Sequence, residues 1–197
     1  SMITGLIYRY AAVAPAVVPD VGATYVFHGS PELGAHVHAS GADVVLAGET
    51  EGDLFGSAVG VGDFNGDGQA DLFVGASGAN PVTPNGIWDG GSVLLWLGPV
   101  HESGTYQGAD ANYSFLNDHE GAMGASLSVG DVNADGIDDL VVGAPDADSE
   151  VAYAAGLVLV FYGDQVVYSE SASNADVILH GATARGDFGA AVRVADF

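Results

Sequence analysis

Two nine-residue segments carry oxygen-bearing side chains at alternate positions. Residues 63–71 and 131–139 share the pattern D-x-N-x-D-G-x-x-D. Calcium takes six to eight oxygen ligands, and a tight loop can turn the side chains at positions 1, 3, 5 and 9 inward while position 7 offers its carbonyl. The glycine at position 6 permits the sharp turn. The predicted calcium ligands are Asp63, Asn65, Asp67, Gln69 and Asp71 in the first loop, and Asp131, Asn133, Asp135, Ile137 and Asp139 in the second.

The alternative to a metal site is a bare turn, because Asp, Asn and Gly are also ordinary hairpin residues. A bare turn does not account for three carboxylates converging in each loop, since like charges at short range repel without a cation. An EF-hand would need a glutamate at position 12, where this sequence has Val74 and Val142. We therefore predict two calcium sites per chain. A third loop beginning at Asp196 finds no acid near Gly5 to complete it, so we expect no third site.

A repeated strand precedes each loop. The dipeptides Phe55-Gly56, Met123-Gly124 and Phe188-Gly189 open similar segments, with their glycines 68 and 65 residues apart. Large and very small residues then alternate along the chain. This alternation predicts a strand whose small face lies close to its neighbours, as the innermost strand of a propeller blade does. The sequence is therefore a repeat of about 65 residues.

Three more strands are predicted in each unit. The second strands are 71–76 and 139–144, the third are 22–29, 92–98 and 156–163, and the fourth are 43–48, 112–117 and 176–181. Four strands per unit are typical of a β-propeller blade. We predict an all-β fold of four-stranded antiparallel blades in one segment, 1–197. Its parts are strands 2–4 of a blade at about 5–49, blades at 55–117 and 123–181, and strand 1 of a further blade at 187–197.

These strands make three blade equivalents, whereas a closed propeller has about four to eight blades. Two arrangements would close the ring. The chain is part of a longer propeller, or two copies form a six-bladed ring in which the last strand of each completes the first blade of the other. The dimer leaves no open sheet edges, so we slightly prefer this homo-oligomer.

The composition of the chain limits the classes of partner that it can bind. A net charge of −23 with three basic residues argues against nucleic acid and anionic membranes, and favours cations. With no cysteine, the fold has no disulfides. The apolar stretch 3–18 is short and contains Arg9 and Pro15, so we expect no membrane insertion.

The repeated dipeptides, the two aspartate loops and the run Gly143-Ala144-Pro145 together resemble the FG-GAP repeats of integrin α-subunit propellers. Met123 and the run 75–77 depart mildly from the family pattern, and the blade count is lower than in the family's seven-bladed ring. The resemblance implies a secreted or cell-surface protein, with calcium loops on one face and a ligand on the opposite face.

The loops on that opposite face offer aromatic rings beside carboxylates, which could stack on a sugar or hold a basic protein loop. The alternative is that they are solvated loop residues. The candidate ligand-binding residues are Trp88, Tyr153, Glu49, Glu51, Asp118 and Glu120. We predict a protein or glycan ligand.

Catalysis has less support in the sequence. We find no Ser-His-Asp arrangement with its motifs, no nucleophile elbow and no phosphate loop. We therefore predict a binding module rather than an enzyme. A propeller-fold hydrolase or lyase acting on polysaccharide, and a purely structural assembly module, are the alternatives.

Overall fold

The computed structural model describes residues 6–10, 21–28, 38–80, 82–83, 86–87, 89–100, 103–117, 120–164 and 169–195, with residues 6–10, 82–83 and 86–87 by backbone alone. Within these ranges the chain forms strands joined by turns and three short 3₁₀ helices. The helices are η1 (Ala39–Gly41), η2 (Gly108–Asp110) and η3 (Ala172–Asn174). None of the described helices is long and apolar enough to cross a lipid bilayer.

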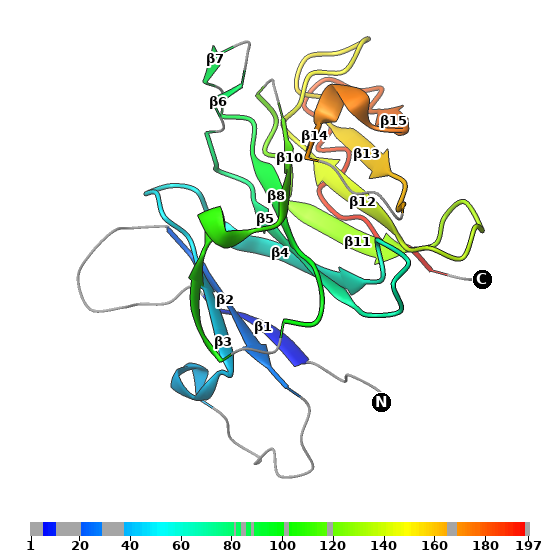
Figure 1. The fold of residues 1–197 in the computed structure, drawn as a ribbon. Coiled ribbons are helices and arrows are strands. Elements are labelled where there is room, and N and C mark those ends of the chain that lie inside the picture. The colour runs from blue at the N-terminus through cyan, green and yellow to red at the C-terminus, as the bar shows by residue number, and fades with distance from the viewer. Residues whose placement is uncertain are drawn as a thin grey trace.

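Three sheets follow one another along the chain (Figure 1). The first blade comprises β1 (Leu6–Tyr10), β2 (Ala23–Phe27) and β3 (Val44–Ala47). The second comprises β4 (Phe55–Gly62), β5 (Asp71–Ala76), β8 (Ser92–Trp96) and β10 (Tyr113–Leu116). The third comprises β11 (Ser126–Gly130), β12 (Asp139–Ala144), β13 (Leu157–Phe161) and β15 (Val177–His180). Neighbouring strands within each blade are antiparallel, which confirms the predicted all-β propeller fold.

Several elements were not predicted. A small hairpin, β6 (Val82–Thr83) and β7 (Gly86–Ile87), lies between β5 and β8. Two short strands, β9 (Gly104–Gln107) and β14 (Glu170–Ser171), each pair in parallel with the outer strand of the preceding blade. A first strand was predicted at 187–197, and its described residues, 187–195, form turns and irregular structure instead. A strand needs a hydrogen-bonded neighbour, and among the described residues this segment has no ladder partner.

The inner strands of successive blades pack closely, and β4 and β11 lie side by side in the centre of Figure 1. Small residues make this approach possible. A Cβ atom on Gly60 would overlap the side chain of Leu127, and one on Gly75 would overlap the carbonyl oxygen of Gly124. The glycine and alanine face of the repeat therefore serves inter-blade packing.

The main core lies between the second and third blades. Four phenylalanines form its centre, and the ring of Phe64 meets Phe73 and Phe115 edge to face, with centroids 5.3 and 5.9 Å apart. Phe115 also packs on Phe161 of the third blade at 4.9 Å. The second strands β5 and β12 are buried along their whole length, which accounts for their apolar character on both faces.

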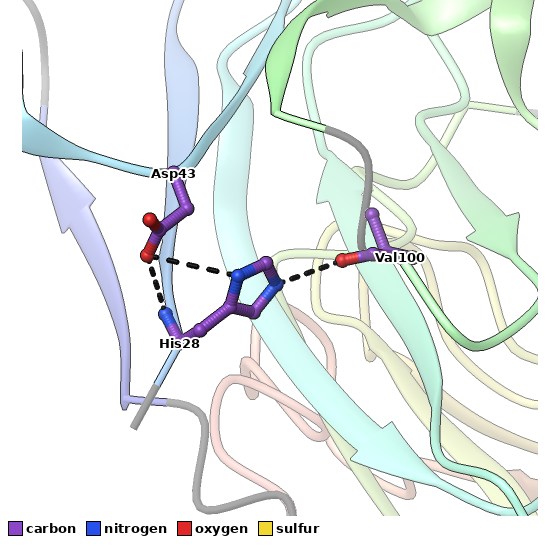
Figure 2. A network of polar contacts seen from close by, with 3 residues as sticks. All are labelled: His28, Asp43 and Val100. Atoms are coloured by element: carbon purple, nitrogen blue, oxygen red, sulfur yellow. Dashed lines mark hydrogen bonds and ion pairs between the residues drawn. The ribbon is translucent and has the colours of Figure 1, made fainter. Parts of the chain in front are cut away.

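A side chain at the start of each fourth strand holds the end of the third. Asp43, Asn112 and Asp176 accept hydrogen bonds from the backbone amides of His28, Leu97 and Tyr162, at 2.7, 2.8 and 2.7 Å. In the first blade the His28 ring lies between Asp43 and the carbonyl oxygen of Val100, 2.9 Å from Nε2 (Figure 2). Because Val100 belongs to the second blade, this contact connects neighbouring blades.

Candidate metal loops and ligand face

The first aspartate loop joins β4 to β5 and is closed by its own side chains. The Asp63 carboxylate accepts hydrogen bonds from the amides of Asp67 and Gly68, at 3.0 and 2.8 Å. The Asn65 side chain accepts from the Asp67 amide at 3.0 Å and donates to the Asp67 carboxylate at 3.0 Å. Asp67 accepts from the amide of Gln69 at 2.8 Å. The loop thus gathers the side chains of positions 1, 3 and 5.

The second loop, between β11 and β12, repeats this pattern. The Asp131 carboxylate accepts from the amides of Asp135 and Gly136, at 3.2 and 2.9 Å. Asn133 accepts from the Asp135 amide and donates to its carboxylate, at 2.9 and 2.8 Å. The amide of Ile137 donates to Asp135 at 2.8 Å. Two loops with the same sequence pattern therefore adopt the same hydrogen-bonded conformation.

The aspartate at position 9 has a different environment, because it is fully buried in both loops. Asp71 accepts from the amides of Phe64 and Gly98, at 3.0 and 2.8 Å. Asp139 accepts from Val132 and Gly163, at 2.8 and 2.9 Å. Burial raises the pKa of Asp71 above its ordinary value, and the amides of Gly98 and Phe64 oppose that rise by stabilising the ionised form. Each position-9 side chain fastens its loop to the end of a third strand.

The expected convergence of three carboxylates is not present in this arrangement. In the described part of the chain, no group of three or more Asp, Glu, His or Cys side chains is placed to hold a metal ion. The reason is that backbone amides engage both oxygens of the position-9 aspartate. The donor chemistry nevertheless fits a hard cation, since positions 1, 3 and 5 of each loop bring two carboxylates and an amide oxygen together.

Asp138, which the sequence analysis did not select, connects the two loops. Its carboxylate accepts a hydrogen bond from the amide of Asp63 at 2.8 Å, and its own amide donates to the Asp63 carbonyl at 3.0 Å. The corresponding residue of the first loop, Ala70, has no such side chain. The sequence signal that could have indicated Asp138 is a charged residue at position 8 in one loop and not in the other.

The opposite ends of β5 and β12 lead to the predicted ligand face. A cavity of about 570 Å³ opens there between the second and third blades. Glu120 and Tyr153 line it, as do Asp146 and Asp148, which were not predicted. Ala147, Leu159 and Ala172 are buried at its apolar floor. The structure therefore brings two of the predicted ligand-face residues to one hollow with an acidic rim.

The other predicted ligand-face residues are placed elsewhere. Glu49 accepts a hydrogen bond from the amide of Ala109 in η2 at 2.9 Å, so it helps to hold the first blade against the second. Glu51 is exposed in the turn between these blades. Trp88 and Asp118 lie outside the described residues, as does Asp196, where a third calcium loop was considered.

Comparison with known proteins gives a consistent result. The FG-GAP repeat family model matches residues 55–95 and 123–161, which are the first three strands of the second and third blades. Integrin alpha-PS5 of Drosophila melanogaster is 32% identical over 158 residues, covering 79% of this chain and 14% of that protein. Integrin alpha-PS2 of the same fly is 35% identical over 124 residues, covering 60% of this chain and 8% of that protein.

Integrin alpha-3 of Cricetulus griseus is 36% identical over 103 residues, covering 51% of this chain and 9% of that protein. The chain thus corresponds to a small part of each relative's length. The family-model matches lie within the two four-stranded blades, and the integrin similarity covers a longer stretch of the chain. The predicted resemblance is confirmed: the chain belongs to the integrin α-type FG-GAP repeat family.

Proposed function

We propose that this chain is a calcium-binding β-propeller interaction module of an extracellular or cell-surface protein. The observation that carries the proposal is the division of each complete blade between its two ends. One end of β5 and β12 holds the repeated aspartate loops, and the other end leads to the acid-rimmed cavity between the blades. Such a division separates residues that stabilise the blade from residues that meet a ligand.

Calcium is the cation that best suits the loops. Their donors are carboxylate, amide and carbonyl oxygens, and no His or Cys accompanies them. The proposed ligands are the ten residues predicted above, one calcium ion in each loop. A bound ion supplies positive charge to a chain whose net charge is −23. The loop residues set the shape of each proposed site, because their hydrogen bonds already fix the turn around positions 1, 3 and 5.

Thermal unfolding with and without calcium tests the metal half of the proposal. At millimolar calcium and a dissociation constant near 0.1 mM, each site should add about 1–2 kcal/mol to the free energy of unfolding. Asp67→Ala and Asp135→Ala should each remove about half of the calcium-dependent stabilisation. Equal melting temperatures in calcium and in chelator would contradict the proposal.

The ligand that we propose is a protein segment with a basic side chain, in preference to a neutral glycan. Glu120, Asp146 and Asp148 place three carboxylates around one cavity, and Tyr153 adds an aromatic ring that is 63% exposed. Carboxylates around an apolar floor favour a cation on an apolar stem, as in lysine or arginine.

Arrays of extracellular matrix proteins and of glycans, both in calcium, test this half. Binding to a protein should fall with Glu120→Gln and Asp146→Asn, and it should weaken as salt increases. Asp164→Asn is the matched control, because Asp164 is exposed just after β13, at the end of the blade away from the cavity. Saturable binding to a glycan alone would reject the preference for a basic protein segment.

A further inference from the structure

The two aspartate loops touch each other at more than one point, and Asp138 makes the polar contact. Its carboxylate accepts a hydrogen bond from the Asp63 amide at 2.8 Å, and its own amide donates to the Asp63 carbonyl at 3.0 Å. Gly62 leaves room for this side chain, because a Cβ atom there would lie 2.6 Å from the Asp138 carboxylate oxygen. Both backbone groups of position 1 in the first loop are therefore bonded to position 8 of the second.

The preceding residue of the second loop, Ile137, makes an apolar contact with the first. A Cβ atom on Gly66, at position 4 of the first loop, would lie 3.2 Å from Cδ1 of Ile137. The Ile137 side chain thus packs over the turn that gathers the donors of the first loop. Its backbone carbonyl is the proposed position-7 ligand of the second loop. The same residue therefore takes part in both loops.

The end of β13 packs against both loops as well. A Cβ atom on Gly163 would overlap the carbonyl oxygens of Asp138 and Phe64, which belong to the second and the first loop. The Gly163 amide donates to Asp139 at 2.9 Å. The contact between the loops is so close that it has no room for an added methyl group. A shift of residues 137–139 would therefore change the contacts of residues 63–66.

The residues that make this contact also belong to the proposed metal site of the second loop. Ile137 and Asp139 are predicted ligands at positions 7 and 9, and Asp138 lies between them. An ion held by both neighbours restricts the backbone of Asp138. The first loop then loses less conformational freedom when it binds its own ion, because the surface that it packs against is already fixed.

We propose that the two calcium sites are coupled through Asp138, so that an ion in either loop raises the affinity of the other. The inference rests on the proposed calcium binding and adds the regulation of the same sites. Linkage requires the effect to be equal in both directions. We expect a coupling of about fivefold, because repulsion between two nearby cations opposes it. The two loops then fill over a narrower range of calcium concentration than independent sites would.

Hydrogen exchange in a chain with one intact site tests the coupling. Asp67→Ala removes a proposed ligand of the first loop but keeps the backbone amides of residues 67 and 68 that donate to Asp63. Calcium bound in the second loop should then slow amide exchange at residues 63–66 about fivefold. Slower exchange at 131–136 with no change at 63–66 would reject the coupling and leave calcium binding intact. No change in either loop would reject calcium binding, and the coupling with it.

Substitutions in the second loop show whether these contacts transmit the effect. In the Asp67→Ala chain, Asp138→Ala removes the acceptor of the Asp63 amide, so calcium should no longer slow exchange at 63–66. Asp138→Asn is the matched control, because it keeps an acceptor oxygen and should keep the effect. Ile137→Ala retains the position-7 carbonyl and should reduce the effect. Equal slowing in Asp138→Ala and Asp138→Asn would exclude Asp138 as the positioning residue.

Calorimetric titration measures the same coupling as a change in affinity. Asp135→Ala, which disables the second loop, should weaken calcium binding at the first loop about fivefold. In a chain that carries Asp138→Ala, adding Asp135→Ala should leave the affinity of the first loop unchanged, since the connection is already broken. A first loop that binds calcium equally well with and without an intact second loop would overturn the proposal.

Discussion

The two aspartate loops share their pattern and their internal hydrogen bonds but differ in what surrounds them. In the first loop the residue at position 2, Phe64, is 3% exposed and belongs to the core. In the second loop Val132 at the same position is 45% exposed. The first loop is also bonded to the next blade through Asp138, which pairs with the backbone of Asp63 on both its amide and its carboxylate.

This difference shows that the loop conformation is local, whereas the packing around the loop depends on the neighbouring blade. Nine residues suffice to reproduce the same turn twice. Burial of position 2 requires the neighbouring third blade. So does the pair of hydrogen bonds between Asp138 and the Asp63 backbone, which we call the clamp on position 1. We therefore expect the first loop to be ordered before calcium binds and the second to depend more on the ion. The variants below separate these contributions, with unfolding measured in chelator unless stated.

The largest expected difference is at position 2. Phe64→Ala removes a ring that packs edge to face on Phe73 and Phe115, and it should lower the free energy of unfolding by about 3–5 kcal/mol. Val132→Ala should change it by less than about 0.5 kcal/mol, because the side chain is half exposed. Urea denaturation of both variants measures the contrast. Similar losses would show that the two loops are equally packed.

Position 9 should show no such contrast. Asp71→Ala removes the buried acceptor of the Phe64 and Gly98 amides. Asp139→Ala removes that of the Val132, Asn133 and Gly163 amides, and each variant should cost about 2 kcal/mol. Urea denaturation at neutral pH compares the two variants. A loss confined to Asp71 would mean that the anchoring also depends on the neighbouring blade.

Removing the clamp should weaken the first loop alone. Asp138→Ala takes away the acceptor of the Asp63 amide and should cost about 1 kcal/mol. Amide hydrogen exchange should then become faster at residues 63–69, while residues 131–136 keep their wild-type rates. Faster exchange in both loops would indicate general loosening instead of a broken clamp.

The smallest expected effect is at position 4. Ala134 has a φ of 64° and Gly66 a φ of 69°, a left-handed conformation that disfavours side chains. Ala134→Gly should therefore stabilise the chain slightly, and Gly66→Ala should destabilise it by about 1 kcal/mol. Thermal unfolding of the two variants should shift in opposite directions. Shifts of the same sign would count against backbone strain as the cause.

Much of this architecture can be predicted from the sequence, because the same strand patterns recur in successive repeats. The alternation after Phe55 and the apolar runs 71–76 and 139–144 predict inner and second strands without any structure. β9 and β14 escaped prediction since they are short and polar, and they become strands only by pairing with another blade. Residues 188–195 do not form the predicted strand, because they have no pairing partner among the described residues.

The side-chain chemistry of the site could be predicted from the sequence, but the positions of those side chains in the fold could be predicted less well. The pattern predicts which side chains of both loops offer oxygen ligands, but it could not show that Asp71 and Asp139 accept hydrogen bonds from backbone amides. The cavity could not be predicted from the sequence, because Asp146, Asp148 and Glu120 line one cavity only when two blades pack together. Contacts between blades, such as that of Asp138 with Asp63, cannot be predicted from a single repeat considered alone.

Each aspartate loop should bind one calcium ion, and calorimetric titration of chelator-stripped protein measures this binding. We expect two ions per chain, with the clamped loop at 63–71 binding more tightly because less ordering accompanies binding. Asp67→Ala should remove the tighter site and Asp135→Ala the weaker one. Absence of binding, or a stoichiometry that neither variant changes, would rule out calcium binding by these residues and leave both loops as metal-free turns.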